Sequence, residues 1–222
     1  MNRRQFLVVL GGAAATQSVP GKKLNNQQDI PASEGAVSLT NGSNRLVLLP
    51  GPDGYGIALF TSIAGRMVRV AQTPFPLRTF YGIRRPESII NVAFRRAEKT
   101  ADGLQANAEF TDKRSNQWEV VFHAVRAANG GFNCRFDCHL SQGTVEDIFF
   151  EHSLTPDMPA SGEETYVLMP GLLYDGNRLT RAPLEIPQLA AAQNFQVDTP
   201  IFTLSIPISA FLERSTGKTL MI

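Results

Sequence analysis

Hydrophobic and polar residues alternate along much of the chain, in short runs that turn residues separate. In residues 104–111 the apolar positions share one face and the polar positions share the other, which is typical of a strand with one buried face. Two further runs, 118–122 and 132–140, repeat the pattern. The residues expected to point inward from them are Trp118, Val120, Phe122, Cys134, Phe136 and Cys138. The three runs predict an antiparallel meander.

Similar short runs occur before and after this meander. Asn41-Gly42 is a strong hairpin turn pair and ends the first of them. The other expected strands lie at 36–40, 45–49, 56–61, 66–70, 148–152, 166–169, 200–212 and 218–222. Helical periodicity is limited to one or two turns at 189–193. The sequence therefore predicts an all-β fold, an antiparallel β-sandwich over residues 34–222 that follows a polar linker at 18–33.

The amino terminus has the features of an export signal. Arg3 and Arg4 precede, after one spacer, Phe6 and Leu7, and an apolar run then leads into small residues. The segment resembles the twin-arginine signal family, whose pattern is Arg-Arg, any residue, then Phe-Leu. The alternative is a general secretory signal. We expect residues 1–17 to be a twin-arginine signal peptide and the protein to be periplasmic or secreted.

The apolar run after the paired arginines is short. It covers residues 6–15, whereas a helix that spans a bilayer needs about 20 residues. We therefore expect no integral membrane segment after the signal is removed.

Composition limits the class of partner. Hydrophobic residues make up 43% of the chain and charged residues 18%, which is enough apolar material for a sizeable core. The 21 basic residues nearly balance the 20 acidic ones. Without a basic field, nucleic acid and anionic membranes are poor candidates, and neutral molecules or proteins are better ones.

The two cysteines, Cys134 and Cys138, lie four residues apart on one predicted strand. That spacing places them roughly 13 Å apart on one face, whereas a disulfide needs Cα atoms within about 7 Å. We expect two separate buried thiols. A metal site is disfavoured, because no other cysteine lies nearby and His139 points to the opposite face. The motifs of phosphate, dinucleotide and zinc sites are missing from the sequence, so we expect no cofactor.

The histidines give little support for catalysis. His123, His139 and His152 lie on three different predicted strands and are expected to be exposed polar residues. Glu151 and His152 are adjacent in one strand, so their side chains point to opposite faces and do not line one pocket.

Two features are candidates for carbohydrate contact. Trp118 is the single tryptophan, and sugar rings stack on aromatic rings, but its phase in the strand favours core packing. The second feature is a loop that turns at Pro170-Gly171 and at Asp175-Gly176. It gathers an aromatic ring, acceptors and a bidentate donor suited to binding hydroxyl groups, namely Tyr174, Asp175, Asn177 and Arg178. Good turn chemistry is the alternative explanation of this loop.

The meander, the loop 170–177 and the segment 207–214 with Thr216-Gly217-Lys218 resemble the amino-terminal β-sandwich of large secreted bacterial glycoside hydrolases, a galactose-mutarotase-like supersandwich. The resemblance covers most of residues 34–222. It implies a carbohydrate partner and a downstream catalytic domain that holds the paired carboxylates, so no catalytic residue is assigned in this chain. The chain ends inside the strand expected at 218–222, which indicates the front part of a longer protein.

Three functions fit the sequence. The first is an exported accessory domain of a carbohydrate-active enzyme that supports or shapes the catalytic module. The second is a sugar epimerase of the mutarotase type, which needs a histidine acid and a carboxylate base on one sheet face. The third is a non-catalytic envelope domain for carbohydrate binding or adhesion. The residues do not choose among them.

Overall fold

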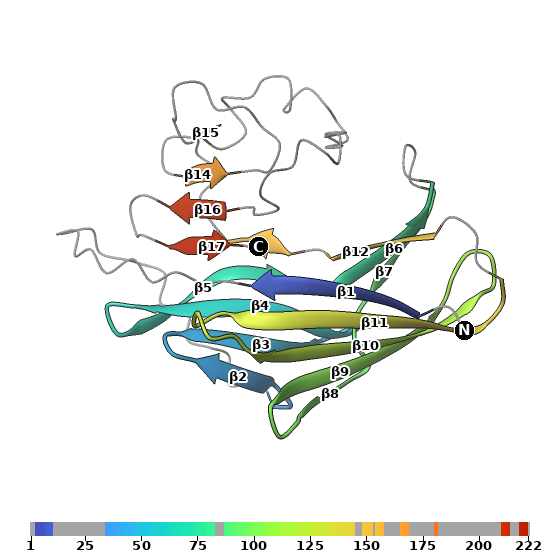
Figure 1. Cartoon of the computed structure of the whole chain (residues 1–222), viewed down its shortest axis with the longest axis horizontal. Helices are drawn as coiled ribbons and strands as arrows, with labels where there is room; N and C mark the ends of the chain where they lie inside the picture. Colours follow the sequence, from blue (N-terminus) through green and yellow to red (C-terminus); the bar gives the residue numbers. More distant parts are fainter. Residues whose placement is uncertain are drawn as a thin grey trace.

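The structure is a computed structural model of the chain (Figure 1). It describes residues 3–10, 34–82, 87–144, 148–152, 154–157, 165–168, 180–181, 210–213 and 218–221. All elements in this part of the chain are strands, and all their pairings are antiparallel. The predicted all-β class is confirmed, and the packing of several antiparallel sheets is consistent with a β-sandwich.

The first large sheet, here called the meander sheet, has five strands. In spatial order they are β1 (Arg3–Leu10), β11 (Phe132–Gln142), β10 (Gln117–Arg126), β9 (Gly103–Thr111) and β8 (Arg96–Lys99). Phe122 of β10 lies opposite Ala106 of β9 on one side and Phe136 of β11 on the other. The predicted three-strand meander is therefore confirmed, with its inward residues in successive cross-strand rows on one face.

The second large sheet, here called the opposing sheet, also has five strands. They are β13 (Thr155–Pro156), β5 (Arg66–Thr73), β4 (Gly54–Ile63), β3 (Asn44–Gly51) and β2 (Val37–Asn41). The β2–β3 hairpin turns at the predicted pair, where Gly42 has a φ of 57°. A positive φ costs glycine little, because it has no Cβ.

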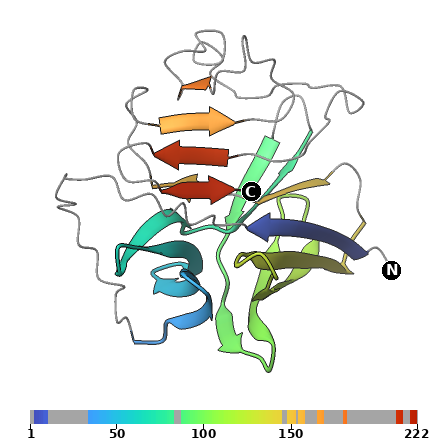
Figure 2. The ribbon, with the colours of Figure 1, turned by 60° about the vertical axis from the view of Figure 1, so that its left-hand side comes forward.

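Two smaller sheets complete the described strands. One contains β12 (Ile148–His152), β6 (Leu77–Tyr81) and β7 (Glu87–Val92). The other contains β15 (Thr180–Arg181), β14 (Thr165–Leu168), β16 (Ala210–Glu213) and β17 (Thr219–Met221). Figure 2 shows the two large sheets facing each other, with the β14–β17 strands above them. The strands expected at 148–152 and 166–169 and the ends of those expected at 200–212 and 218–222 correspond to elements of these sheets.

The main core fills the space between the two large sheets. Leu46, Leu48 and Ile57 of the opposing sheet belong to the same buried cluster as Phe122 and Phe136 of the meander sheet. Each has at most 1% of its surface exposed. A buried side chain of this size contributes roughly 1.5–3 kcal/mol, so these facing rows hold the sheets together.

The opposing sheet buries apolar residues on its outer face as well. Val47, Ala58 and Phe60 form a second cluster there and are at most 2% exposed. This explains why 46–49 and 57–60 are continuous apolar runs rather than alternating ones, since a strand buried on both faces has no polar side.

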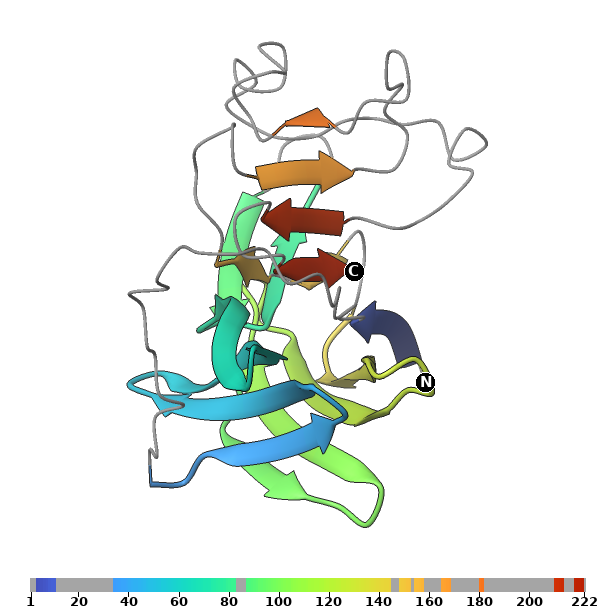
Figure 3. The same ribbon diagram turned by 90° about the vertical axis from the view of Figure 1, so that its left-hand side faces the viewer.

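Strand β1 contains the segment expected to be the core of the export signal. Its backbone pairs with β11 along the whole strand, from Arg3 opposite His139 to Leu10 opposite Phe132. In the full chain, residues 3–10 therefore cover an edge of the meander sheet (Figure 3). Without them, β11 would be an edge strand.

Candidate functional site

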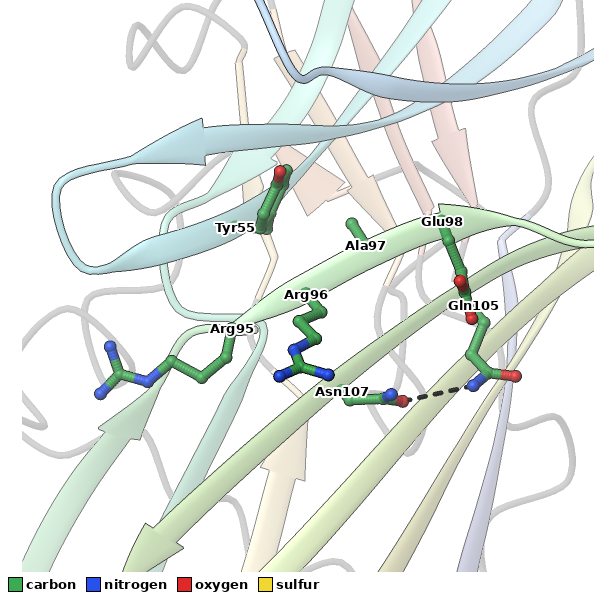
Figure 4. A pocket seen from close by; sticks show the side chains of 7 residues that line it. All are labelled: Tyr55, Arg95, Arg96, Ala97, Glu98, Gln105 and Asn107. Atoms are coloured by element: carbon green, nitrogen blue, oxygen red, sulfur yellow. Dashed lines mark hydrogen bonds between the residues drawn. The ribbon is translucent and has the colours of Figure 1, made fainter.

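A groove with a volume of about 360 Å³ follows the outermost edge of the meander sheet, where β8 has a partner on one side only. Its lining residues are Tyr55, Arg95, Arg96, Ala97, Glu98, Gln105 and Asn107 (Figure 4). One aromatic side chain and five polar or charged ones therefore surround a concave surface that the sequence did not single out.

The position of Tyr55 depends on a close backbone contact between β4 and Phe94, which lies just before β8. The N–H of Tyr55 donates to the carbonyl of Phe94 at 2.7 Å, and the N–H of Phe94 donates to the carbonyl of Tyr55 at 3.0 Å. The preceding Gly54 has a φ of 131°, and a Cβ there would lie 2.3 Å from the Phe94 carbonyl oxygen. Only glycine fits this approach, which places Tyr55 beside β8.

The register of β8 against β9 arranges the polar side chains. Arg96 lies opposite Asn107, and Glu98 lies opposite Gln105, so these four side chains share one face. The two amides bond to each other, since Nε2 of Gln105 donates to Oδ1 of Asn107 at 3.4 Å. Figure 4 shows Arg96 and Asn107 side by side, with Tyr55 on the other side of β8.

The outer face of the meander sheet continues from the groove toward β11. Gln105, His123 and Arg135 form one cross-strand row on this face. Nε2 of His123 lies 3.7 Å from Oδ2 of Asp137, and an Nη of Arg135 lies 3.1 Å from the same oxygen. The side chain of Asp137 is only 5% exposed. A histidine and a carboxylate thus meet on one sheet face, which the spacing along the chain did not predict.

His123 and His139 lie on the outer face, as the alternation predicts, and both are half-buried. His152 differs from the prediction of an exposed residue. Its ring lies 5.2 Å from that of Phe136, its Nδ1 lies 2.8 Å from the Pro76 carbonyl, and burial lowers its pKa despite that hydrogen bond. By its exposed surface His152 is half-buried, as His123 and His139 are.

Glu151 points away from His152, as predicted. Its carboxylate forms an ion pair with Arg78 of the neighbouring strand β6. The two adjacent residues therefore do not form one acid/base pair.

Trp118 is part of the protein interior. It is 2% exposed, its ring stacks 6.4 Å from that of Phe110 and it meets Phe150 edge-on at 5.0 Å. Core packing, which its phase in the strand favoured, is what the structure shows. No face of the indole is open for a sugar ring to stack on.

The indole of Trp118 also completes a buried polar network at the β9–β10 turn. Oδ2 of Asp112 accepts hydrogen bonds from Tyr81 Oη at 2.5 Å, Trp118 Nε1 at 2.9 Å and Asn116 Nδ2 at 3.0 Å. Burial opposes the charge of Asp112, but these hydrogen bonds outweigh it and lower its pKa to about 2. Burial, together with the hydrogen bond to Asp112, raises the pKa of Tyr81 to about 12.

Cys134 and Cys138 are both buried, as predicted. Burial raises the pKa of the Cys134 thiol far above its usual range, so this thiol is unreactive in the folded protein. Within the described ranges, no group of three or more His, Cys, Asp or Glu residues is arranged to hold a metal ion. No helix in those ranges is long and apolar enough to cross a membrane.

The predicted loop residues Tyr174, Asp175, Asn177 and Arg178 lie outside the described residues, as does the short helical stretch expected at 189–193. Their role stays a prediction. No protein family, curated protein or solved structure matches the chain.

Proposed function

We propose that the chain is an exported accessory β-sandwich domain of a carbohydrate-active enzyme, and that it contacts carbohydrate through the groove beside β8. The observation that supports this most directly is the composition of the groove. A partly exposed tyrosine, Tyr55, borders it together with the amides of Gln105 and Asn107 and the carboxylate of Glu98.

These groups suit a sugar. Amides donate and accept hydrogen bonds, and a carboxylate accepts them, so together they match hydroxyl groups that do both. A partly exposed aromatic ring adds apolar surface for the C–H face of a pyranose. The groove is open at the edge of a sheet, which suits a chain of sugars better than a small ligand enclosed on all sides.

Other parts of the proposal rest on the sequence. Arg3 and Arg4 with Phe6 and Leu7 favour the twin-arginine route, which exports folded cargo to the periplasm or beyond. The two buried thiols at Cys134 and Cys138 fit a domain that folds in the reducing cytoplasm before export. The supersandwich subtype and a downstream glycoside hydrolase domain are part of the same proposal, through the resemblance described above.

The test is binding of the purified full chain to a panel of soluble polysaccharides by affinity electrophoresis. We expect retardation in at least one polysaccharide gel and a loss of at least tenfold in affinity for the double variant Gln105→Ala/Asn107→Ala. These side chains bond to each other rather than to the core, so the variant should fold normally.

The matched control is Gln72→Ala, which removes an exposed amide from β5 of the opposing sheet. It should bind like the unmodified chain. An unmodified chain that binds no saccharide, or a double variant that binds as tightly as the control, would count against the groove.

A second candidate is a sugar epimerase of the mutarotase type. The specific observation in its favour is the approach of His123 to Asp137 on one face of the meander sheet. Such an enzyme should speed the interconversion of aldose anomers, which polarimetry follows, and His123→Ala should abolish that activity. Equal rates with and without the protein across a panel of aldoses would exclude it.

A further inference from the structure

Two neighbouring guanidinium groups border the groove without a carboxylate partner in the described part of the chain. Arg95 has one long hydrogen bond, 3.4 Å from Nη1 to the backbone carbonyl of Asp53. Arg96 is exposed and forms no ion pair there. Both side chains therefore keep most of their N–H donors available to a ligand.

Three other arginines of the described strands are paired with carboxylates. Arg69 pairs with Asp157 at 2.8 Å, Arg78 pairs with Glu151, and Arg135 lies 3.1 Å from Asp137. The groove thus differs from these sites in its charge balance. Two guanidinium groups face it against the single carboxylate of Glu98, so its lining is net positive although the whole chain is nearly neutral.

We propose that the groove selects an acidic saccharide, a chain that carries uronic acid residues. The sugar carboxylate would pair with Arg96, which lies opposite Asn107, while Asn107, Gln105 and Glu98 receive the hydroxyl groups. A guanidinium is a planar fork that matches a planar carboxylate with two parallel hydrogen bonds, a fit that an ammonium group does not offer. This inference rests on the proposed carbohydrate function and names its ligand class.

The spacing of the side chains supports a ligand that carries both a carboxylate and hydroxyl groups. Arg96 on β8 lies opposite Asn107 on β9, and Glu98 lies opposite Gln105 two residues further along. Successive side chains on one face of a strand are roughly 7 Å apart. A sugar unit bound here would have its carboxylate near Arg96 and Asn107 and its hydroxyl groups near Glu98 and Gln105.

The experiment is isothermal titration calorimetry of the full chain with a galacturonic acid oligomer and with a neutral galactose oligomer of equal length. We expect at least tenfold tighter binding of the acidic oligomer. Arg96→Gln should remove most of this preference, and Arg96→Lys should restore only part of it. A sulfated galactose oligomer serves as a third ligand and should bind more weakly than the uronate.

The matched control is Arg66→Gln, which removes an exposed arginine from β5 of the opposing sheet. It should change the affinity less than twofold. Equal losses in Arg66→Gln and Arg96→Gln would mean unspecific charge attraction and would overturn the inference. Preference for the sulfated oligomer would also overturn it.

The two proposals fail in different ways. Binding of the neutral oligomer as tightly as the acidic one, unchanged in Arg96→Gln, overturns the acidic ligand but leaves carbohydrate binding in place. Binding of none of the three oligomers, and of no polysaccharide in the panel, removes both. Unchanged thermal unfolding of Arg96→Gln, expected for an exposed side chain without a protein partner, separates either result from misfolding.

Discussion

The indole Nε1 of Trp118 donates a hydrogen bond of 2.9 Å to Oδ2 of Asp112, across the turn that joins β9 to β10. Asp112 also closes the turn itself, since its Oδ1 accepts from the backbone N–H groups of Arg114 and Asn116. The single tryptophan of the chain therefore stabilises the β9–β10 hairpin. Trp118 thus has a structural role, and the groove beside β8 is the candidate sugar contact.

Replacing Asp112 by alanine should destabilise the protein strongly. The carboxylate is 5% exposed and its loss leaves the Tyr81 hydroxyl, the Trp118 N–H and two backbone N–H groups without their acceptor. We expect the free energy of unfolding to fall by roughly 2–4 kcal/mol. Urea denaturation followed by tryptophan fluorescence measures it. Asp102→Ala, in an exposed turn, is the control and should stay within about 0.5 kcal/mol of the unmodified chain.

The same carboxylate should make stability depend on acid pH. Its pKa is about 2 in the folded protein, below the value near 3.8 that an unhindered aspartate has. The stabilisation is therefore present above about pH 4 and is lost as the pH falls toward 2. Denaturation midpoints between pH 5 and pH 2 should fall, and Asp112→Asn should show a shallower fall. Parallel profiles for the two proteins would contradict this.

Tyr81 should give the opposite dependence in alkali. Its pKa is raised from 10 to about 12, so the neutral phenol is favoured in the folded state. Stability from this group is present below pH 10 and is lost as the pH rises through 12. We expect Tyr81→Phe to be less stable at neutral pH but to lose less further stability between pH 10 and pH 12. Absorbance at the phenolate band should also show one tyrosine titrating late only when Tyr81 is present.

Gly54→Ala should disturb the groove through the backbone. The added Cβ would lie 2.3 Å from the Phe94 carbonyl oxygen, and the φ of 131° is unfavourable for alanine. We expect a loss of roughly 1–3 kcal/mol in unfolding free energy and weaker saccharide binding. Gly65→Ala separates strain from collision, because Gly65 also has a positive φ, of 77°, but a Cβ there meets no atom within 4 Å. Equal losses at both positions would show that the close approach to Phe94 is unimportant.

Export should depend on the paired arginines. Replacing Arg3 and Arg4 by lysine should leave the protein in the cytoplasm of a bacterial host with a twin-arginine translocase, which cell fractionation measures. Lysine keeps the charge, so a general secretory signal would still function. Unchanged export of the double variant would therefore point to the general route. The control is Lys22→Arg with Lys23→Arg, a charge-conserving change in the predicted linker.

Pairing of the signal segment with β11 adds a structural side to this prediction. In the full chain β1 occupies the β11 edge, with Gln5 opposite Asp137 in the register. Cleavage of residues 1–17 would open this edge. Unpaired strand edges accept further strands, so the processed and unprocessed forms should differ at β11 in amide hydrogen exchange.

Local pattern was sufficient for the meander. In β9, β10 and β11 every second residue is apolar, and the structure buries those positions, with Phe122, Phe136 and both cysteines fully enclosed. A strand with one face in the core and the other in solvent must alternate apolar and polar residues. Strands β6 and β7 have no such pattern. Residues of β6 are buried nearly throughout, those of β7 are mostly exposed, and neither arrangement produces a period of two.

The sequence by itself determined the strand class, the hairpin turns, the inward rows and the separation of the two thiols, because each follows from the backbone geometry of neighbouring residues. Only the tertiary structure decided which polar and aromatic side chains lie close enough to form a candidate site. Tyr55 lines the same groove as Arg96 and Asn107 because β4 lies beside Phe94, far along the chain. His123 approaches Asp137 through the register of β10 against β11. Such contacts depend on which strand edges adjoin and in which register. Those choices are made by the burial of the whole core, so local residue patterns do not encode them.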